Sequence, residues 1–132
     1  MKSLRILLLP LLLVFLSACS GRVVLDDPAP IAVPTHVSLE QVRQVVRESL
    51  SRRGWTPTTA GPSAFDGRYS RRGLSAEISV TYDTNDVVIK YVGSEGLKFK
   101  QKGDERYIHG NYNKWIDRLV REINVRLSRI AN

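Results

Sequence analysis

The sequence predicts an α+β fold. We expect a two-layer sandwich in which an antiparallel meander of three to four strands carries two helices on one face, in the order α-β-β-β-α. Residues 38–50 and 112–130 repeat apolar residues at helical spacing. Between them, residues 74–82 alternate strictly between apolar and polar, which is typical of a strand with one buried face. Both helices are therefore expected on the apolar face of the sheet.

The first residues have the features of a targeting segment. Lys2 and Arg5 precede an apolar run over residues 6–16, and small residues follow it. The run contains Pro10 and is shorter than the roughly 20 apolar residues that span a bilayer. A permanent transmembrane anchor is therefore not expected.

Residues 16–19, Leu-Ser-Ala-Cys, resemble the lipobox of bacterial lipoproteins. In that family the cysteine receives a diacylglyceryl group, the chain is cut just before it, and the new amine is acylated. The resemblance implies a signal peptide over residues 1–18 and lipidation of Cys19, the only cysteine in the chain. An ordinary secretory signal is the alternative. Ser20 stands where enterobacterial inner-membrane lipoproteins carry aspartate, which implies the outer membrane, with the body facing the periplasm.

The mature chain is expected to form one domain, over residues 38–132. Loss of Lys2 and Arg5 with the signal lowers the formal charge from +7 to +5. Residues 19–37 carry three prolines among small and acidic residues, which predicts a lipidated flexible tether with a reach of roughly 56 Å. Within it, the apolar triplet 23–25 either stays disordered, which we expect, or pairs as a strand.

The first helix has clear end signals. Ser38 and Gln41 have the spacing of a capping box, and Val37 and Val42 that of a hydrophobic staple. Gly54 suits the left-handed C-terminal cap, which would return Trp55 onto the core as a lid. The expected apolar stripe is Leu39, Val42, Val45, Val46 and Leu50.

The remaining elements follow from alternation and turn residues. Expected strands are 56–59, at an edge because of Pro57, then 64–71, 74–82 and 87–92. Residues 93–96 interrupt the meander, and 97–100 form a short strand or an extended arm that ends at 102–104. In the last helix the expected stripe is Tyr112, Ile116, Leu119, Val120, Ile123, Leu127 and Ile130, with Asp117–Arg121 and Glu122–Arg126 as outer ion pairs.

Residues 91–99, Tyr-Val-Gly-Ser-Glu-Gly-Leu-Lys-Phe, and 108–116, Ile-His-Gly-Asn-Tyr-Asn-Lys-Trp-Ile, resemble a group of small proteobacterial lipoproteins. The shared pattern is a serine and a leucine after the third strand, followed by a Tyr-Asn-x-Trp helix start. The resemblance implies an envelope lipoprotein domain and carries no catalytic role.

Two groups of residues are candidate binding sites. Tyr107, His109, Asn113 and Trp115 combine aromatic and hydrogen-bonding groups that suit a sugar or a peptide. Their structural alternative is that Asn111 caps the helix while Tyr112 and Trp115 close the core. The second group is Lys98, Lys100 and Lys102, which would point three ammonium groups the same way if extended.

We expect no enzyme activity, no metal and no cofactor. The only cysteine is assigned to lipid, no Gly-x-Ser-x-Gly elbow occurs, and the two histidines have no local ligand spacing. The export signal excludes nucleic acid as a partner. Two functions stay open: a structural or assembly lipoprotein that holds a protein partner, and a binding module for an anionic envelope lipid or glycan.

Overall fold

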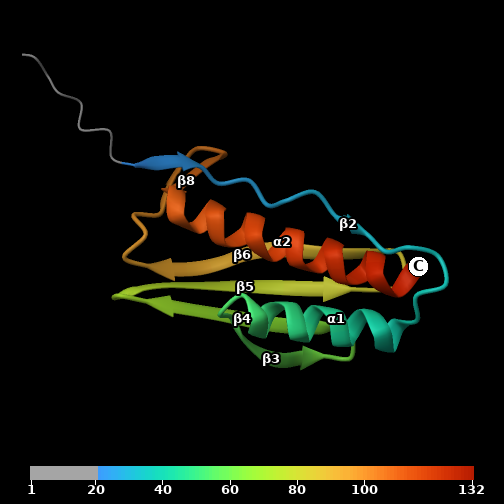
Figure 1. Ribbon diagram of the computed structural model, residues 1–132. Coiled ribbons are helices and arrows are strands. Elements are labelled where there is room, and N and C mark those ends of the chain that lie inside the picture. Colours follow the sequence, from blue (N-terminus) through green and yellow to red (C-terminus); the bar gives the residue numbers. More distant parts are fainter. Residues whose placement is uncertain (1–20) are drawn as a thin grey trace, which may run out of the picture.

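The computed structural model describes residues 21–132 (Figure 1). The expected signal peptide, residues 1–18, and the expected lipidation site Cys19 lie outside the described residues. The elements are β1 (Arg22–Val24), β2 (Ile31–Ala32), α1 (Leu39–Arg52), β3 (Thr56–Gly61), β4 (Ala64–Arg71), β5 (Leu74–Tyr82), β6 (Asp86–Glu95), β7 (Lys100–Lys102), β8 (Glu105–His109) and α2 (Gly110–Ala131). Neither α1 nor α2 is both long and apolar enough to cross a membrane.

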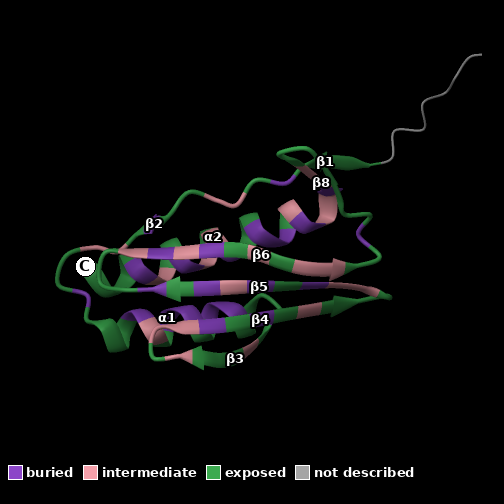
Figure 2. Cartoon of the chain, turned by 180° about the vertical axis from the view of Figure 1, so that it is seen from behind, coloured by how far each residue is buried: buried purple, intermediate pink, exposed green. Residues whose placement is uncertain are grey.

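The main sheet has five antiparallel strands in the order β2-β6-β5-β4-β3. Strands β3 to β6 form the expected meander, with β3 at one edge. The break expected at residues 93–96 is wrong, because β6 continues to Glu95 and pairs there with β5. Both helices cover one face of this sheet, and the opposite face is open (Figures 1 and 2). The strict alternation of β5 is confirmed, because Ala76, Ile78, Val80 and Tyr82 are buried while Glu77 is exposed.

Helix α1 packs closely on the sheet. A Cβ atom added at Gly67 would lie 3.0 Å from Ile78 Cγ1 and 3.1 Å from Leu50 Cδ2. The missing side chain at position 67 therefore makes room for the helix. Trp55 is buried as expected, and its backbone N–H donates to the Leu50 carbonyl at 2.9 Å.

The start of α1 confirms the capping box, since Ser38 and Gln41 exchange bonds of 3.2 and 2.9 Å. The expected stripe is wrong at Leu39, which is 43% exposed because the whole first turn lies in solvent. The stripe of α2 is likewise wrong at Ile130, in an exposed last turn.

A second sheet, β1-β8-β7, was not expected, so the single-meander sandwich is corrected to an α+β fold with two antiparallel sheets. Val23 pairs with Ile108 and Lys100 with Tyr107. Of the residues of β8, only Ile108 is fully buried, so the strand has no run of alternating apolar residues that could reveal it.

The flexible tether is wrong for residues 21–37, which run along the domain. Leu25, Ile31 and Val37 are buried in the core, and β2 pairs with β6. Asp27 accepts from the Tyr91 N–H at 2.8 Å and from the Arg106 guanidinium at 3.4 Å. The prolines fall between these anchoring residues, where no ladder hydrogen bond is needed.

Candidate functional site at the basic end of the domain

The expected lysine arm is part of a β-hairpin, here called the lysine hairpin (residues 100–109). Lys100 and Lys102 are exposed in β7, an edge strand that pairs with β8. Lys98 has a φ of 55°, a left-handed conformation, so the extended alternation over the three lysines is wrong at this residue. Only Lys100 and Lys102 share a face of a strand.

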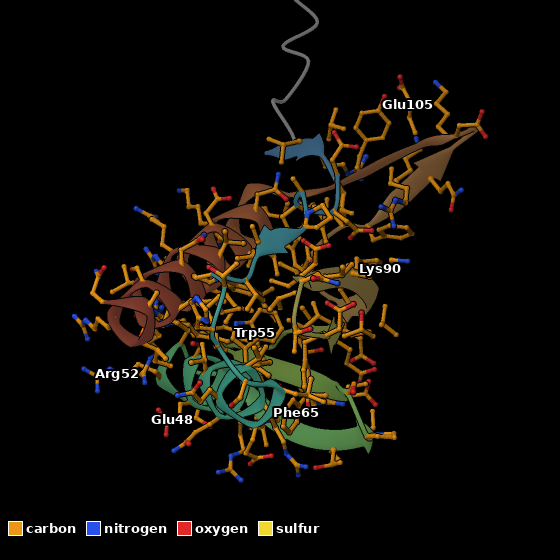
Figure 3. All side chains as sticks on the ribbon, turned by 90° about the vertical axis from the view of Figure 1, so that its right-hand side faces the viewer. Glu48, Arg52, Trp55, Phe65, Lys90 and Glu105 are labelled. Carbon is orange, nitrogen blue, oxygen red and sulfur yellow. The ribbon has the colours of Figure 1, made fainter. Side chains whose placement is uncertain are left out.

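The hairpin projects from the body, with Glu105 near its tip (Figure 3). Tyr107 lies in β8 and its hydroxyl donates to the Glu105 carboxylate. This hydrogen bond raises the pKa of Tyr107 above its ordinary value, because it favours the protonated phenol. Tyr107 is thus a half-buried hydrogen-bond donor opposite Lys100 in the lysine hairpin.

His109 caps α2. Its Nδ1 atom accepts from the Asn111 N–H at 3.1 Å, so His109 takes the capping role that was expected of Asn111. This bond satisfies one of the backbone N–H groups in the first turn of α2 that have no partner within the helix. Asn113 donates from Nδ2 to the Val24 carbonyl at 3.1 Å and so ties β1 to α2.

Trp115 does not join Tyr107 and His109 in one site. Its ring lies 4.3 Å from the ring of Tyr69, between α2 and the main sheet, and only 7% of the residue is exposed. Of the predicted cluster, His109 and Asn113 therefore have structural roles at β1 and the start of α2. Trp115 closes the core at a different place.

Trp115 does border a hollow, which we call the basic pocket. It has a volume of about 240 Å³ and lies between the β4–β5 turn and the first two turns of α2. Its lining residues are Arg71, Arg72, Leu74, Asn111, Lys114, Trp115 and Arg118. Four of these are cations, and none of the described residues that line the pocket is acidic.

Local geometry explains this gathering of charge. Arg72 and Gly73 have φ values of 51° and 77°, which make the tight turn that sets Arg71 and Arg72 at the hairpin tip. On α2, residues 111, 114 and 118 recur at helical spacing and so lie on one side of the helix.

The four cations of the basic pocket have no neutralising partner among residues 21–132. The ion pairs within residues 21–132 involve four other cations, Arg53, Arg68, Arg106 and Arg126. The first turn of α2 holds no acidic residue, so the partial positive charge of the helix N-terminus adds to the pocket's potential.

The basic pocket and the lysine hairpin lie at the same end of the molecule. The β4–β5 turn, the end of β6, the lysine hairpin and the start of α2 all lie at the end where β1 begins (Figure 1). We call this the basic end. Gly21, the first described residue, contacts it directly through a bond from the Gly110 N–H to the Gly21 carbonyl of 3.0 Å.

Sequence reasoning missed the pocket, although part of the signal is visible. Arg71 and Arg72 at a predicted turn, and Lys114 and Arg118 one turn apart on a predicted helix, are each recognisable. Their meeting depends on the angle between sheet and helix.

Comparison with protein-family models, with curated proteins and with solved structures found no match.

Proposed function

We propose that this protein is a lipid-anchored lipoprotein of the outer membrane, acylated at Cys19 and facing the periplasm, whose basic end binds an anionic envelope ligand. One observation carries the proposal. Six cations that form no ion pair among residues 21–132, the four of the basic pocket and Lys100 and Lys102 of the lysine hairpin, lie at the end where the chain leads back towards Cys19. This favours the anionic ligand over the protein partner.

The packing of residues 21–37 supports a short connection between this end and the proposed lipid anchor. Two residue steps separate Cys19 from Gly21, which is about 7 Å at most. An acylated chain would hold the basic end at the headgroups, instead of letting the body stand off by the length of a tether. Each cation near an anionic surface contributes about 1 kcal/mol of attraction.

A structural or assembly role with a protein partner is the second candidate, since β7 is an exposed edge strand. Its three residues include two lysines. Short, lysine-bearing edges are a device by which proteins prevent strand addition. The edge itself therefore favours contact through charge over pairing with another strand.

Co-sedimentation tests the proposal on the mature chain, residues 19–132, made with Cys19→Ser so that acylation cannot hold it on lipid. The triple variant Lys98→Gln, Lys100→Gln, Lys102→Gln is compared with wild type on lipopolysaccharide and on anionic liposomes at two salt concentrations. Screening acts over about 8 Å at physiological salt, so binding should weaken steeply as salt rises. The triple variant should lose most of it.

A second triple variant, Arg47→Gln, Lys90→Gln, Arg129→Gln, is the matched control. It removes three exposed cations away from the basic end, and it should bind like wild type. Equal binding by wild type and the lysine variant, or no binding at low salt, would make the protein partner the better reading.

A further inference from the structure

The basic pocket is a more specific feature than the lysine hairpin. We infer that it is a binding site for a phosphomonoester group. This deepens the proposed function by naming a ligand class and a discrete site. The chemistry of the pocket itself rests on Arg71, Arg72, Lys114 and Arg118 and needs no lysine of the hairpin.

The charge of the empty pocket argues for an anion. Four cations line one hollow of about 240 Å³, with no acidic residue among its described lining and no ion pair to any of them within residues 21–132. Like charges held together repel, and a bound anion relieves that repulsion while it gains from each cation. The turn and the helix hold these residues in place without help from a counter-charge.

The number and type of donors select the anion. Guanidinium groups offer forked N–H pairs that match phosphate oxygens, and Lys114 adds a point charge. A phosphomonoester carries about −1.5 to −2 charges at pH 7 and three acceptor oxygens, so it engages several of these groups at once. A carboxylate carries a single charge and leaves most of them unmatched.

The volume and the lining of the basic pocket indicate what the phosphate is attached to. Drug-sized ligands occupy pockets of about 300–1,000 Å³, so a hollow of about 240 Å³ suits a headgroup or a single phosphorylated sugar. Leu74 and the edge of Trp115 provide the apolar part of the lining, against which a sugar ring can rest. The phosphate comes either from a lipid headgroup or from a soluble phosphorylated compound.

Titration of the mature chain with glucose 6-phosphate tests the soluble source, followed by calorimetry and by Trp fluorescence. Vesicles of phosphatidylcholine with phosphatidic acid, whose headgroup is a phosphomonoester, test the lipid source against vesicles with the phosphodiester phosphatidylglycerol. Wild type should bind glucose 6-phosphate or prefer phosphatidic acid to phosphatidylglycerol. Binding of neither, or equal binding of both lipids with no response to glucose 6-phosphate, overturns the inference.

The variant Arg71→Gln, Arg118→Gln removes one arginine from each wall of the pocket. It should lower affinity for the responding probe at least tenfold, and because both residues are exposed its unfolding midpoint should match wild type. Arg71→Lys, Arg118→Lys keeps the charge and should recover only part of the affinity, since the forked donors are lost.

Two further variants separate this inference from the proposed function. Lys100→Gln, Lys102→Gln should leave glucose 6-phosphate binding unchanged while it weakens binding to anionic liposomes. Arg47→Gln, Arg129→Gln removes two distant charges and should change neither. If either of these variants lowers the affinity for glucose 6-phosphate, or the preference for phosphatidic acid over phosphatidylglycerol, as much as the pocket variant does, general charge is responsible and the phosphate site is wrong.

Discussion

Ile78 and Ile116 show the fold at the scale of single residues, because both lie in the core, one on the main sheet and the other on α2. They are 0% and 4% exposed. Truncation of either to Ala should lower the free energy of unfolding by about 2–5 kcal/mol, since it removes packed methylenes and leaves a cavity. Denaturant unfolding of the mature chain measures the loss.

Glu77 is the neighbouring control. Its carboxylate accepts from Arg68 at 2.9 Å, but both side chains are more than half exposed, so Glu77→Ala should cost about 1 kcal/mol or less. Equal losses at positions 77 and 78 would mean that the register of β5 is wrong.

At the same scale, residue type predicted burial better than it predicted role. Trp55 was expected as a core lid, and core closure was the alternative to ligand binding for Trp115; both residues are buried. Asn113 has several possible hydrogen-bond partners, and its choice of the Val24 carbonyl depends on β1 lying beside α2. A polar side chain's partner is a property of the assembled fold, which spacing along the chain does not contain.

At the scale of elements, the N-terminal segment behaves as part of the core. Leu25 is 1% exposed, whereas its neighbour Val24 is 49% exposed. Leu25→Ala should therefore lower the free energy of unfolding by about 2–5 kcal/mol, and Val24→Ala by about 0.5 kcal/mol or less. Urea midpoints provide the comparison. If both substitutions lowered the free energy of unfolding by the same small amount, the packing of residues 21–37 would be wrong and the flexible tether would be supported.

The long helical and strand periods made α1, α2 and the meander predictable. The short strands β1, β2 and β7, of two or three residues, and the five-residue β8 were not, because they are stabilised by pairing with distant partners. The expected ion pair Asp117–Arg121 is wrong, because the Arg121 guanidinium donates to the Asp117 backbone carbonyl and not to its carboxylate. Glu122–Arg126 is confirmed at 3.0 Å.

Glu122 links the two helices, because it accepts from Arg126 at 3.0 Å and from Arg53 at 3.1 Å. The bond from Arg126 contributes most to a lowered pKa of Glu122, and Arg53 adds to it. A lowered folded-state pKa contributes stability that is complete above the ordinary glutamate value and is lost as pH falls through the folded value.

Glu122→Gln should therefore cost about 1 kcal/mol or less at pH 7, and the difference from wild type should shrink below about pH 4.5. Urea unfolding at pH 7, 5 and 3 measures it. Glu95→Gln is the control, because Glu95 is exposed and has no ion pair within residues 21–132, and it should show no such trend. A Glu122→Gln difference that persists at pH 3 would contradict the role of the charge.

At the scale of the whole molecule, the amphipathic pattern predicts layers but not the distribution of charge over the ends. The mature charge of +5 was read as spread over solvated faces, with a lysine arm beside a break in the sheet. The structure brings Arg71 and Arg72 next to Lys114 and Arg118, residues that are distant in the sequence. Such a cluster arises only when the β4–β5 turn and α2 are packed together.

The proposed lipid anchor would hold the basic end at the membrane, and it depends on Cys19. Cys19→Ser should leave an unacylated precursor with residues 1–18 still attached, because the cut follows lipidation in the resembling family. Mass spectrometry of the envelope fraction identifies the species. A variant that is still cleaved before residue 19 and still held by the membrane after a high-salt wash would contradict lipidation.

The short connection to Cys19 also predicts an orientation. Helix α2 has 22 residues, about 33 Å of helix, and runs from the basic end to the opposite end, near the β5–β6 turn. Acylation at Cys19 would consume the only native thiol, so a fluorophore could be attached to Lys100→Cys or to Asp83→Cys in the acylated protein in vesicles. Headgroup-labelled lipid should quench the label at position 100 strongly and the one at position 83 weakly. The contrast should persist at high salt, because the covalent connection is not screened as charge attraction is. Equal quenching at both positions would mean that the domain does not keep its basic end at the membrane.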